Sequence, residues 1–304
     1  MAFDLETYKR ITGRLDLDGI DFDDFRERPL APEHLRVIRF MHDVEMHTSC
    51  YLRNLLNTKA HHDPEVTTFL TMWNFEEYWH GEALARVLEA HGEVAGEARV
   101  GTMRQRLGWR ITTSPILWMG FSAATKHFLA VHMTFGVINE WTTQGGYSRL
   151  LQIADHSTLT ELLKRIMKQE GRHIDYYRQT AIEHLEGSKA AQRTTRWMIK
   201  ALWSPVGAGV MPREETTHLV DTLFTGPDGR AVIDRIDRRV DRLPGLEGLA
   251  LMNGAQRTYG TPAAISSAPS AVARNAVSRN AVSRNAGPAP TGQGDVIRVE
   301  AKAS

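Results

Sequence analysis

The sequence predicts an all-α protein organised around a bundle of four long helices, and two observations lead to this prediction. Apolar residues recur at the three- and four-residue spacing of a helix that buries one face. Helix-capping and turn-forming residues separate the segments, as where Asp63 precedes Pro64 at the start of the second. The four segments cover residues 32–57, 64–91, 115–140 and 158–187. Shorter helical patterns follow at residues 190–203, 214–224 and 231–243.

Composition divides the 304 residues into two parts. Residues 1–254 contain the helical patterns and enough apolar residues for a sizeable core, so we expect a single folded domain there. Residues 255–304 are rich in Ala, Ser, Pro and Gly and contain a five-residue repeat that starts at Ala271, Ala276 and Ala281. Because such a segment has little apolar surface to bury, we expect a disordered C-terminal tail.

Charge and cysteine content narrow the possible partners and compartment. The formal net charge of +1 gives no reason to expect a nucleic-acid partner. A single cysteine, Cys50, excludes an intrachain disulfide and fits a reducing compartment. The N-terminal residues lack the basic start and apolar run of a secretory signal, so we expect a cytoplasmic protein.

The segment at residues 115–140 is apolar nearly all round. Lys126 and His127 interrupt it, and no second hydrophobic segment accompanies it. We therefore expect a helix buried in the centre of the bundle and no membrane span, with His127 and His132 as hydrogen-bonded core or rim residues.

Residues 98–139 contain no Asp or Glu, and most of their basic residues lie between Arg99 and Arg110. This basic segment is either a solvated connector or a docking surface for an acidic partner or a phosphate-bearing substrate.

Three Glu-x-x-His pairs occur: Glu77/His80, Glu170/His173 and Glu215/His218. Chance alone produces about one such pair in a chain of this composition. The first two pairs lie within the apolar stripes of long helical segments, where a carboxylate is costly to bury unless it is paired or binds a metal. The third pair has no such setting, so we assign it to the surface or to packing.

Each of the first two pairs follows a helical segment that carries one Glu on its apolar side. These residues are Glu45 in the first segment and Glu140 in the third. One Glu from each of two helices and a Glu-x-x-His pair from each of the other two is the ligand pattern of ferritin-like di-iron and di-manganese bundles. The predicted metal ligands are therefore Glu45, Glu77, His80, Glu140, Glu170 and His173.

Carboxylate and imidazole ligands suit Fe(II) or Mn(II) and offer no thiolate to favour zinc or copper. Four carboxylates also balance the charge of two divalent cations. A di-iron centre of this kind reduces O2 with two external electrons and can drive oxidation of an unactivated C–H bond, while the protein supplies a dry cavity and a positioned substrate.

Residues 76–81, Glu-Glu-Tyr-Trp-His-Gly, resemble the first motif of the soluble acyl-acyl carrier protein desaturases, Glu-Glu-x-x-His-Gly. Residues 169–173, Gln-Glu-Gly-Arg-His, resemble the second motif, Asp-Glu-x-x-His. The resemblance covers roughly residues 32–185 and implies that the six residues above are iron ligands. It also implies that Thr143 matches a threonine on the oxygen-binding side.

The resemblance further implies a homodimer that inserts a double bond into a fatty acyl chain carried on acyl carrier protein, with electrons from a ferredoxin-type donor. The chain departs from the family pattern at Gln169, where an acidic residue is common, and at Trp79 and Gly171 inside the motifs. Alternatives to desaturation are a di-iron oxygenase that hydroxylates or N-oxygenates another small molecule, a non-enzymatic ferritin-like iron-binding protein, and a buried polar network satisfied by protons.

Overall fold

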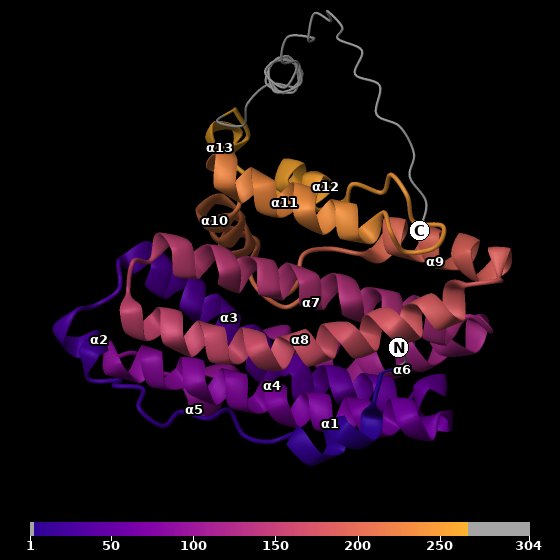
Figure 1. Ribbon diagram of the computed structural model, residues 1–304, viewed down its shortest axis with the longest axis horizontal. Helices are drawn as coiled ribbons and strands as arrows, with labels where there is room; N and C mark the ends of the chain where they lie inside the picture. The colour runs from indigo at the N-terminus through magenta and orange to yellow at the C-terminus, as the bar shows by residue number, and fades with distance from the viewer. Residues whose placement is uncertain (1–2, 267–304) are drawn as a thin grey trace, which may run out of the picture. The chain divides into compact units, whose positions relative to one another are not determined.

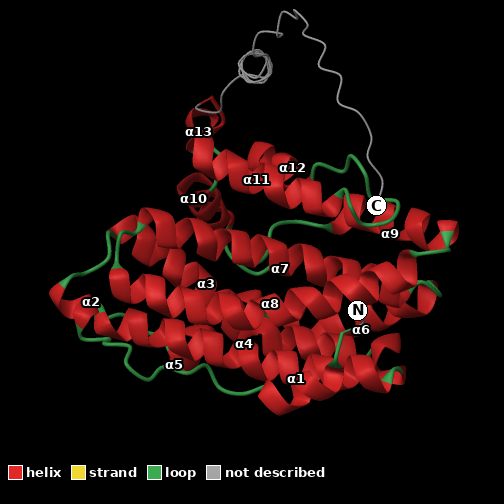
Figure 2. Cartoon of the chain, in the orientation of Figure 1, coloured by secondary structure: helices red, strands yellow, loops and turns green. Residues whose placement is uncertain are grey.

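The computed structural model of the protein describes residues 3–266. Four long helices form the centre of the fold (Figure 1). They are α3 (Pro32–Leu56), α4 (Pro64–Ala90), α7 (Phe128–Ile153) and α8 (Ser157–Leu185). Helix α3 packs along α4, and α7 packs along α8. Every regular element of the described residues is helical, so the all-α prediction is confirmed (Figure 2).

Shorter helices surround this bundle. Helices α9, α10 and α11 pack against α7, and α10 also contacts α3. The shorter elements are α1 (Leu5–Ile11), α2 (Asp24–Glu27), the 3-10 helix η1 (Lys59–His62), α5 (Gly96–Leu107), α6 (Trp109–Ala124), α9 (Lys189–Leu202), α10 (Arg213–Leu223), α11 (Gly226–Val240), α12 (Leu251–Tyr259) and α13 (Pro262–Ser266).

The second long helix begins where its sequence indicates. The carboxylate of Asp63 accepts hydrogen bonds from the backbone N–H groups of Glu65 and Val66, and Pro64 occupies the first turn. This cap satisfies donors that have no partner within the helix. The connection between α3 and α4 is short and contains η1. It reverses the direction of the chain, so that α4 runs back alongside α3.

Two glycines allow the central helices to approach closely. A Cβ atom at Gly81 would lie 2.6 Å from the sulfur of Met46, where α3 faces α4. A Cβ atom at Gly136 would lie 2.3 Å from the Tyr177 ring, where α7 faces α8. These contacts explain why glycine is tolerated within long helices, where it otherwise costs about 1 kcal/mol relative to alanine.

The prediction of one buried helix over residues 115–140 was wrong. The chain breaks at Thr125, which is extended, and α6 and α7 are separate helices. The Lys59 ammonium group donates to the backbone carbonyls of Ala123 and Thr125 and thereby satisfies the end of α6. Only α7 lies in the centre. Helix α6 exposes large apolar side chains, among them Trp109 and Leu117.

The predicted boundary between residues 254 and 255 falls inside α12. Ala255 and Gln256, just after this boundary, are buried against the rest of the body. The composition therefore placed the end of the helical body too early. The five-residue repeat of the predicted tail lies outside the described residues. Among the helices of residues 3–266, none combines the length and apolar composition that crossing a membrane requires.

The basic segment is partly neutralised within the fold. Arg99 forms a bidentate ion pair with Asp43, and Arg104 donates to the backbone carbonyl of Met46 and to Ser49. Arg106 and Arg110 are exposed. The charge that this segment offers to a partner is therefore smaller than the sequence alone suggests.

We predict that Gly136→Ala destabilises the protein by about 1–3 kcal/mol, because the new methyl group meets the fully buried Tyr177 ring. The matched control is Gly171→Ala in α8, where a Cβ atom would meet nothing within 4 Å. Its gain in helix propensity should leave stability unchanged or raise it by up to about 1 kcal/mol. Urea unfolding followed by circular dichroism measures both; equal destabilisation would contradict the packing argument.

Candidate metal centre

The six predicted ligands come together from all four central helices. Glu45 lies on α3, Glu140 lies on α7, and the two Glu-x-x-His pairs lie on α4 and α8. They form two overlapping groups in which one ligand atom of each residue lies within 4.8 Å of the others. One group is Glu45, Glu77, His80 and Glu170, and the other is Glu77, Glu140, Glu170 and His173.

The overlap assigns different roles to the carboxylates. Glu77 and Glu170 belong to both groups, so each is placed to bridge two metal ions. Glu45 and His80 belong to one group only, and Glu140 and His173 to the other. Each metal position would therefore have one terminal carboxylate, one terminal imidazole and two shared carboxylates. The predicted proximity of the six residues is confirmed.

Both imidazoles turn the same atom toward the centre. Nδ1 of His80 lies 3.2 Å from Glu170 Oε1 and 3.5 Å from Glu77 Oε2. Nδ1 of His173 lies 3.1 Å from Glu77 Oε1 and 3.1 Å from Glu170 Oε2. His80 Nδ1 and Glu170 Oε1 lie close together without hydrogen-bond geometry, and among the described residues neither atom has another hydrogen-bond partner. Two close, buried ligand atoms of this kind fit two donors to one metal ion.

The other ring nitrogen of each histidine is held by an outer partner. His80 Nε2 donates to the amide oxygen of Gln169 at 2.9 Å, and the Gln169 amide nitrogen donates to the Gly13 carbonyl at 3.2 Å. His173 Nε2 donates to Glu76 Oε2 at 2.8 Å. Such outer hydrogen bonds fix the tautomer and orientation of metal-binding histidines. An acidic residue is common at the position of Gln169 in the family that the motifs resemble. Gln169 therefore still provides an acceptor for His80 but carries no negative charge.

Glu76 belongs to a network that sequence reasoning did not assign to the site. Its carboxylate accepts hydrogen bonds from Arg172 at 2.6 Å and from the Tyr8 hydroxyl at 3.0 Å. Tyr8 comes from α1, far away in the sequence. The position of Glu76 beside Glu77 in the motif was the available signal, whereas nothing in the local pattern pointed to Tyr8.

The terminal carboxylates are held in the same way. The Tyr147 hydroxyl donates to Glu45 Oε1 at 2.5 Å, and Trp73 Nε1 donates to Glu140 Oε1 at 3.0 Å. Tyr147 lies seven residues after Glu140, on the same face of α7, which is the signal that could have identified it. These donors orient the carboxylates and partly offset the cost of burying them.

Burial and mutual repulsion govern the protonation of the metal-free centre. Burial, followed by the charges of Glu77 and Glu170, raises the pKa of Glu45 and that of Glu140 well above the ordinary range. Burial also opposes ionisation of Glu77 and Glu170, but hydrogen bonds from the protonated neighbours outweigh it and lower the pKa of both. These shifts favour the ionised form of Glu77 and Glu170 and the protonated form of Glu45 and Glu140.

Burial shifts the pKa of the histidines downward, opposite to its effect on the carboxyl groups. Burial lowers the pKa of His80, but its contacts with Glu170 and Glu77 outweigh burial and raise the pKa to about 9. The pKa of His173 is also raised well above its ordinary value, because the surrounding acidic groups outweigh burial. Without metal, the pKa shifts thus favour imidazolium groups that face ionised Glu77 and Glu170, which lowers the net charge of the core.

A cavity of about 660 Å³ borders the centre on one side. It touches Glu45, Glu77 and Glu140 and lies between α3, α6, α7 and the segment at residues 204–210. Apolar and aromatic side chains form most of its lining, including Trp118, Phe121 and Phe135. Thr143 also lines this cavity, so the structure places it on the open side of the centre. Neither His80 nor His173 lines this cavity, and both are fully buried.

The predictions for Glu215/His218 and for His132 are confirmed, whereas His127 is half-buried and its role stays a prediction. Glu215 forms an ion pair with Arg36, and His218 contacts the backbone carbonyl of Glu33, so the third Glu-x-x-His pair lies outside both ligand groups. His132 is buried, and its Nδ1 lies 3.4 Å from the Tyr51 hydroxyl. Burial lowers the pKa of His132 to about 4, which keeps it neutral.

We predict that His173→Ala lowers the apparent affinity for Fe(II) by more than the ~10–100-fold typical of losing an outer partner, because a direct ligand is lost. His218→Ala is the matched control and should bind iron like the unaltered protein, since His218 lies outside both groups. Anaerobic titration with Fe(II) and circular dichroism measure binding and helicity. Equal iron binding by both variants would refute the ligand assignment.

We predict that loading the centre with two divalent metal ions at pH 7 releases protons, because the raised pKa values of Glu45, Glu140, His80 and His173 favour protonated forms that must lose a proton to bind. Metal affinity should therefore rise as the pH approaches about 9, where His80 loses its proton without metal. Anaerobic calorimetry in two buffers of different ionisation enthalpy counts the protons, and Glu45→Gln should release one fewer. Binding without proton release would contradict the protonation described above.

No family model matches this sequence, and no curated protein or solved structure matches it either. The function has to be argued from the centre itself and from the cavity beside it.

Proposed function

We propose that this protein is a di-iron oxidoreductase that uses O2 and two electrons to desaturate a fatty acyl chain carried on acyl carrier protein. The observation that supports this most directly is the opening of a six-ligand dinuclear centre onto a largely apolar cavity of about 660 Å³. That volume lies within the ~300–1,000 Å³ range of small-molecule sites, and its lining suits a hydrocarbon chain.

The chain's residues fit two iron ions. Glu45, His80, Glu140 and His173 would be terminal ligands, and Glu77 and Glu170 would bridge. Manganese fits the same donors. When bound, the metals supply the redox chemistry with O2 that removal of two hydrogens requires.

The protein contributes position and exclusion of water. Gln169 and Glu76 orient the imidazoles, and Tyr147 and Trp73 orient the terminal carboxylates, so the ligand set is preorganised before substrate arrives. With a substrate bound, aromatic residues of the cavity wall would shield the open side from water. The hydroxyl group of Thr143, one turn beyond Glu140, would hold or move a proton there.

The partners follow from the resemblance and from surface charge. Acyl carrier proteins are acidic, and two exposed arginines, Arg106 in the last turn of α5 and Arg110 in the first turn of α6, belong to the helices beside the cavity wall. A ferredoxin-type electron donor and a homodimer are carried over from the resemblance alone, as is a cytoplasmic location from the N-terminal sequence.

One observation favours a second candidate, an oxygenase that hydroxylates or N-oxygenates a smaller polar molecule. His47, Thr48 and Asn139 line the same cavity, and buried His47 Nδ1 has no hydrogen-bond partner among the described residues. A substrate that is wholly hydrocarbon within the cavity would leave that group unsatisfied, whereas a polar substrate would bind it.

We predict that the anaerobically iron-loaded protein, given O2, a reduced ferredoxin and acyl carrier protein bearing a fatty acyl chain, yields an acyl product lighter by two hydrogens. Mass spectrometry of the released chains measures this, and His173→Ala should give none while His218→Ala remains active. The free fatty acid, offered in parallel, should react poorly if the carrier docks.

The other outcomes discriminate the alternatives. A product heavier by one oxygen would replace the desaturase by the oxygenase. Oxidation of bound iron with no acyl product from any chain length would contradict acyl oxidation and favour iron binding without turnover. Failure to bind iron would exclude both enzymes and return the centre to a proton-satisfied network.

A further inference from the structure

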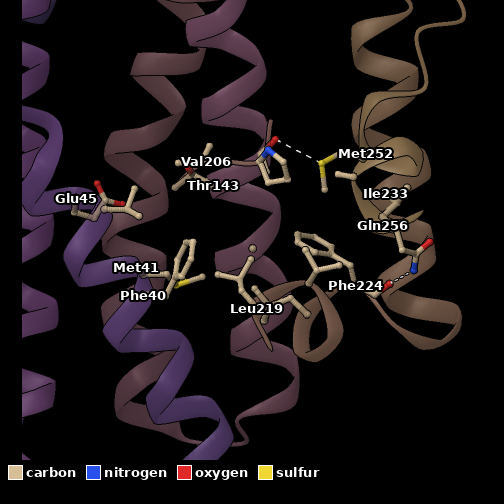
Figure 3. A pocket seen from close by; sticks show the side chains of 17 residues that line it. Phe40, Met41, Glu45, Thr143, Val206, Leu219, Phe224, Ile233, Met252 and Gln256 are labelled. Carbon is tan, nitrogen blue, oxygen red and sulfur yellow. Dashed lines mark hydrogen bonds between the residues drawn. The ribbon is translucent and has the colours of Figure 1, made fainter. Parts of the chain in front are cut away.

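A second cavity, of about 50 Å³, lies on the side of the centre that faces the C-terminal helices (Figure 3). Its walls come from α3 and α7 and from α10, α11 and α12. Apolar side chains form most of the lining, including Met41, Leu219 and Ile233. At one end the cavity reaches Glu45 and Thr143, which also border the larger cavity.

The size of this cavity restricts its occupant. One water molecule needs about 10–15 Å³ of such space, and an apolar cavity of about 150 Å³ holds benzene. A cavity of about 50 Å³ is therefore too small for a length of acyl chain. It has room for a diatomic molecule.

Its polar groups are already satisfied away from the metal centre. The Gln256 side chain donates to the Phe224 carbonyl and accepts from Arg230, and the Thr142 hydroxyl donates to the Ile138 carbonyl. A water molecule on that side would find few hydrogen-bond partners, and cavities of this kind stay dry. Apolar gases suit such a space because they form no hydrogen bonds.

The position of the small cavity would allow it to hold a reactant beside the centre. Val44, Pro205 and Val206 line both cavities, so the two cavities adjoin at these residues. When a substrate fills the larger cavity, it covers the open side of the centre. The smaller cavity still reaches Glu45 and Thr143 from the other direction. A small apolar reactant can therefore wait beside the centre while the substrate is bound.

We propose that this small cavity is a binding site for O2 that supplies the metal centre from the side of α10–α12. The inference rests on the proposed function, because it assigns the path of that function's oxidant. Gly146 helps to keep the space open, since a Cβ atom there would lie 3.3 Å from the Met41 methyl carbon.

Dissolved O2 can be tested directly, because it is paramagnetic and relaxes nearby nuclei. In the full-length, metal-free chain carrying ¹³C-labelled methionine methyl groups, Met41 and Met252 should relax faster under O2 than under N2. Met198 is the internal control, since it is as buried as Met41 but does not line the cavity. Equal relaxation of all three methyl groups under O2 would overturn the proposal.

A matched pair of variants tests the space itself. Val220→Ile adds one methylene group to the cavity wall, and Val240→Ile adds one at a buried position of α11 outside the lining. The first should lose the excess relaxation of Met41 and Met252, and the second should retain it. Retention in both variants would contradict binding in this cavity.

Oxidation of the iron-loaded protein supplies the second readout. With substrate bound, Val220→Ile should oxidise more slowly at limiting O2 than Val240→Ile, and high O2 should restore the rate. Equal rates would show that O2 reaches the centre by another route and would overturn the supply role. The relaxation experiment needs no iron, so it stays informative if the protein fails to act as a di-iron enzyme.

Discussion

The burial of four carboxylates and two imidazoles in one core is the constraint on which the rest of the structure depends. Each of Glu45, Glu77, Glu140 and Glu170 is at most 6% exposed. Four ionised carboxylates with so little contact with water would be strongly destabilising. Protons on the terminal carboxylates and on the histidines remove that cost in the metal-free chain, and two divalent cations would remove it in the loaded one. The alignment of the four helices would allow two divalent cations to take the place of these protons.

The clustering of the six side chains could be predicted because its signals are local and repeated. A Glu-x-x-His pair places both side chains on one helical face, and an apolar stripe on that face says that it points inward. Glu45 and Glu140 are single residues and carried less information by themselves. They became informative only because each precedes a helix with a pair, in the order that a four-helix ligand set requires.

The parts that could not be predicted depend on contacts between distant residues. The break at Thr125 is stabilised by Lys59, and no pattern within residues 115–140 records that contact. The apolar run therefore indicated one buried helix, although its first half became the exposed α6. The closure of the histidine side by Tyr8, and both cavities, likewise arise from packing between separate helices. Composition placed the end of the body at residue 254 because it did not register the buried face of α12.

The two metal positions are built from the same ligand types but are not equivalent. The outer partner of His173 is the carboxylate of Glu76, which Arg172 and Tyr8 hold in place, whereas the outer partner of His80 is the neutral amide of Gln169. A carboxylate partner makes an imidazole a stronger donor than an amide does, because it stabilises positive charge on the ring. The position of His173 and Glu140 should therefore favour the more oxidised ion. Both terminal carboxylates border the large cavity, but only Glu45, which shares its group with His80, also reaches the small one. The proposed O2 path would reach the centre at Glu45, whose group holds His80, whereas the imidazole with a carboxylate partner belongs to the other group.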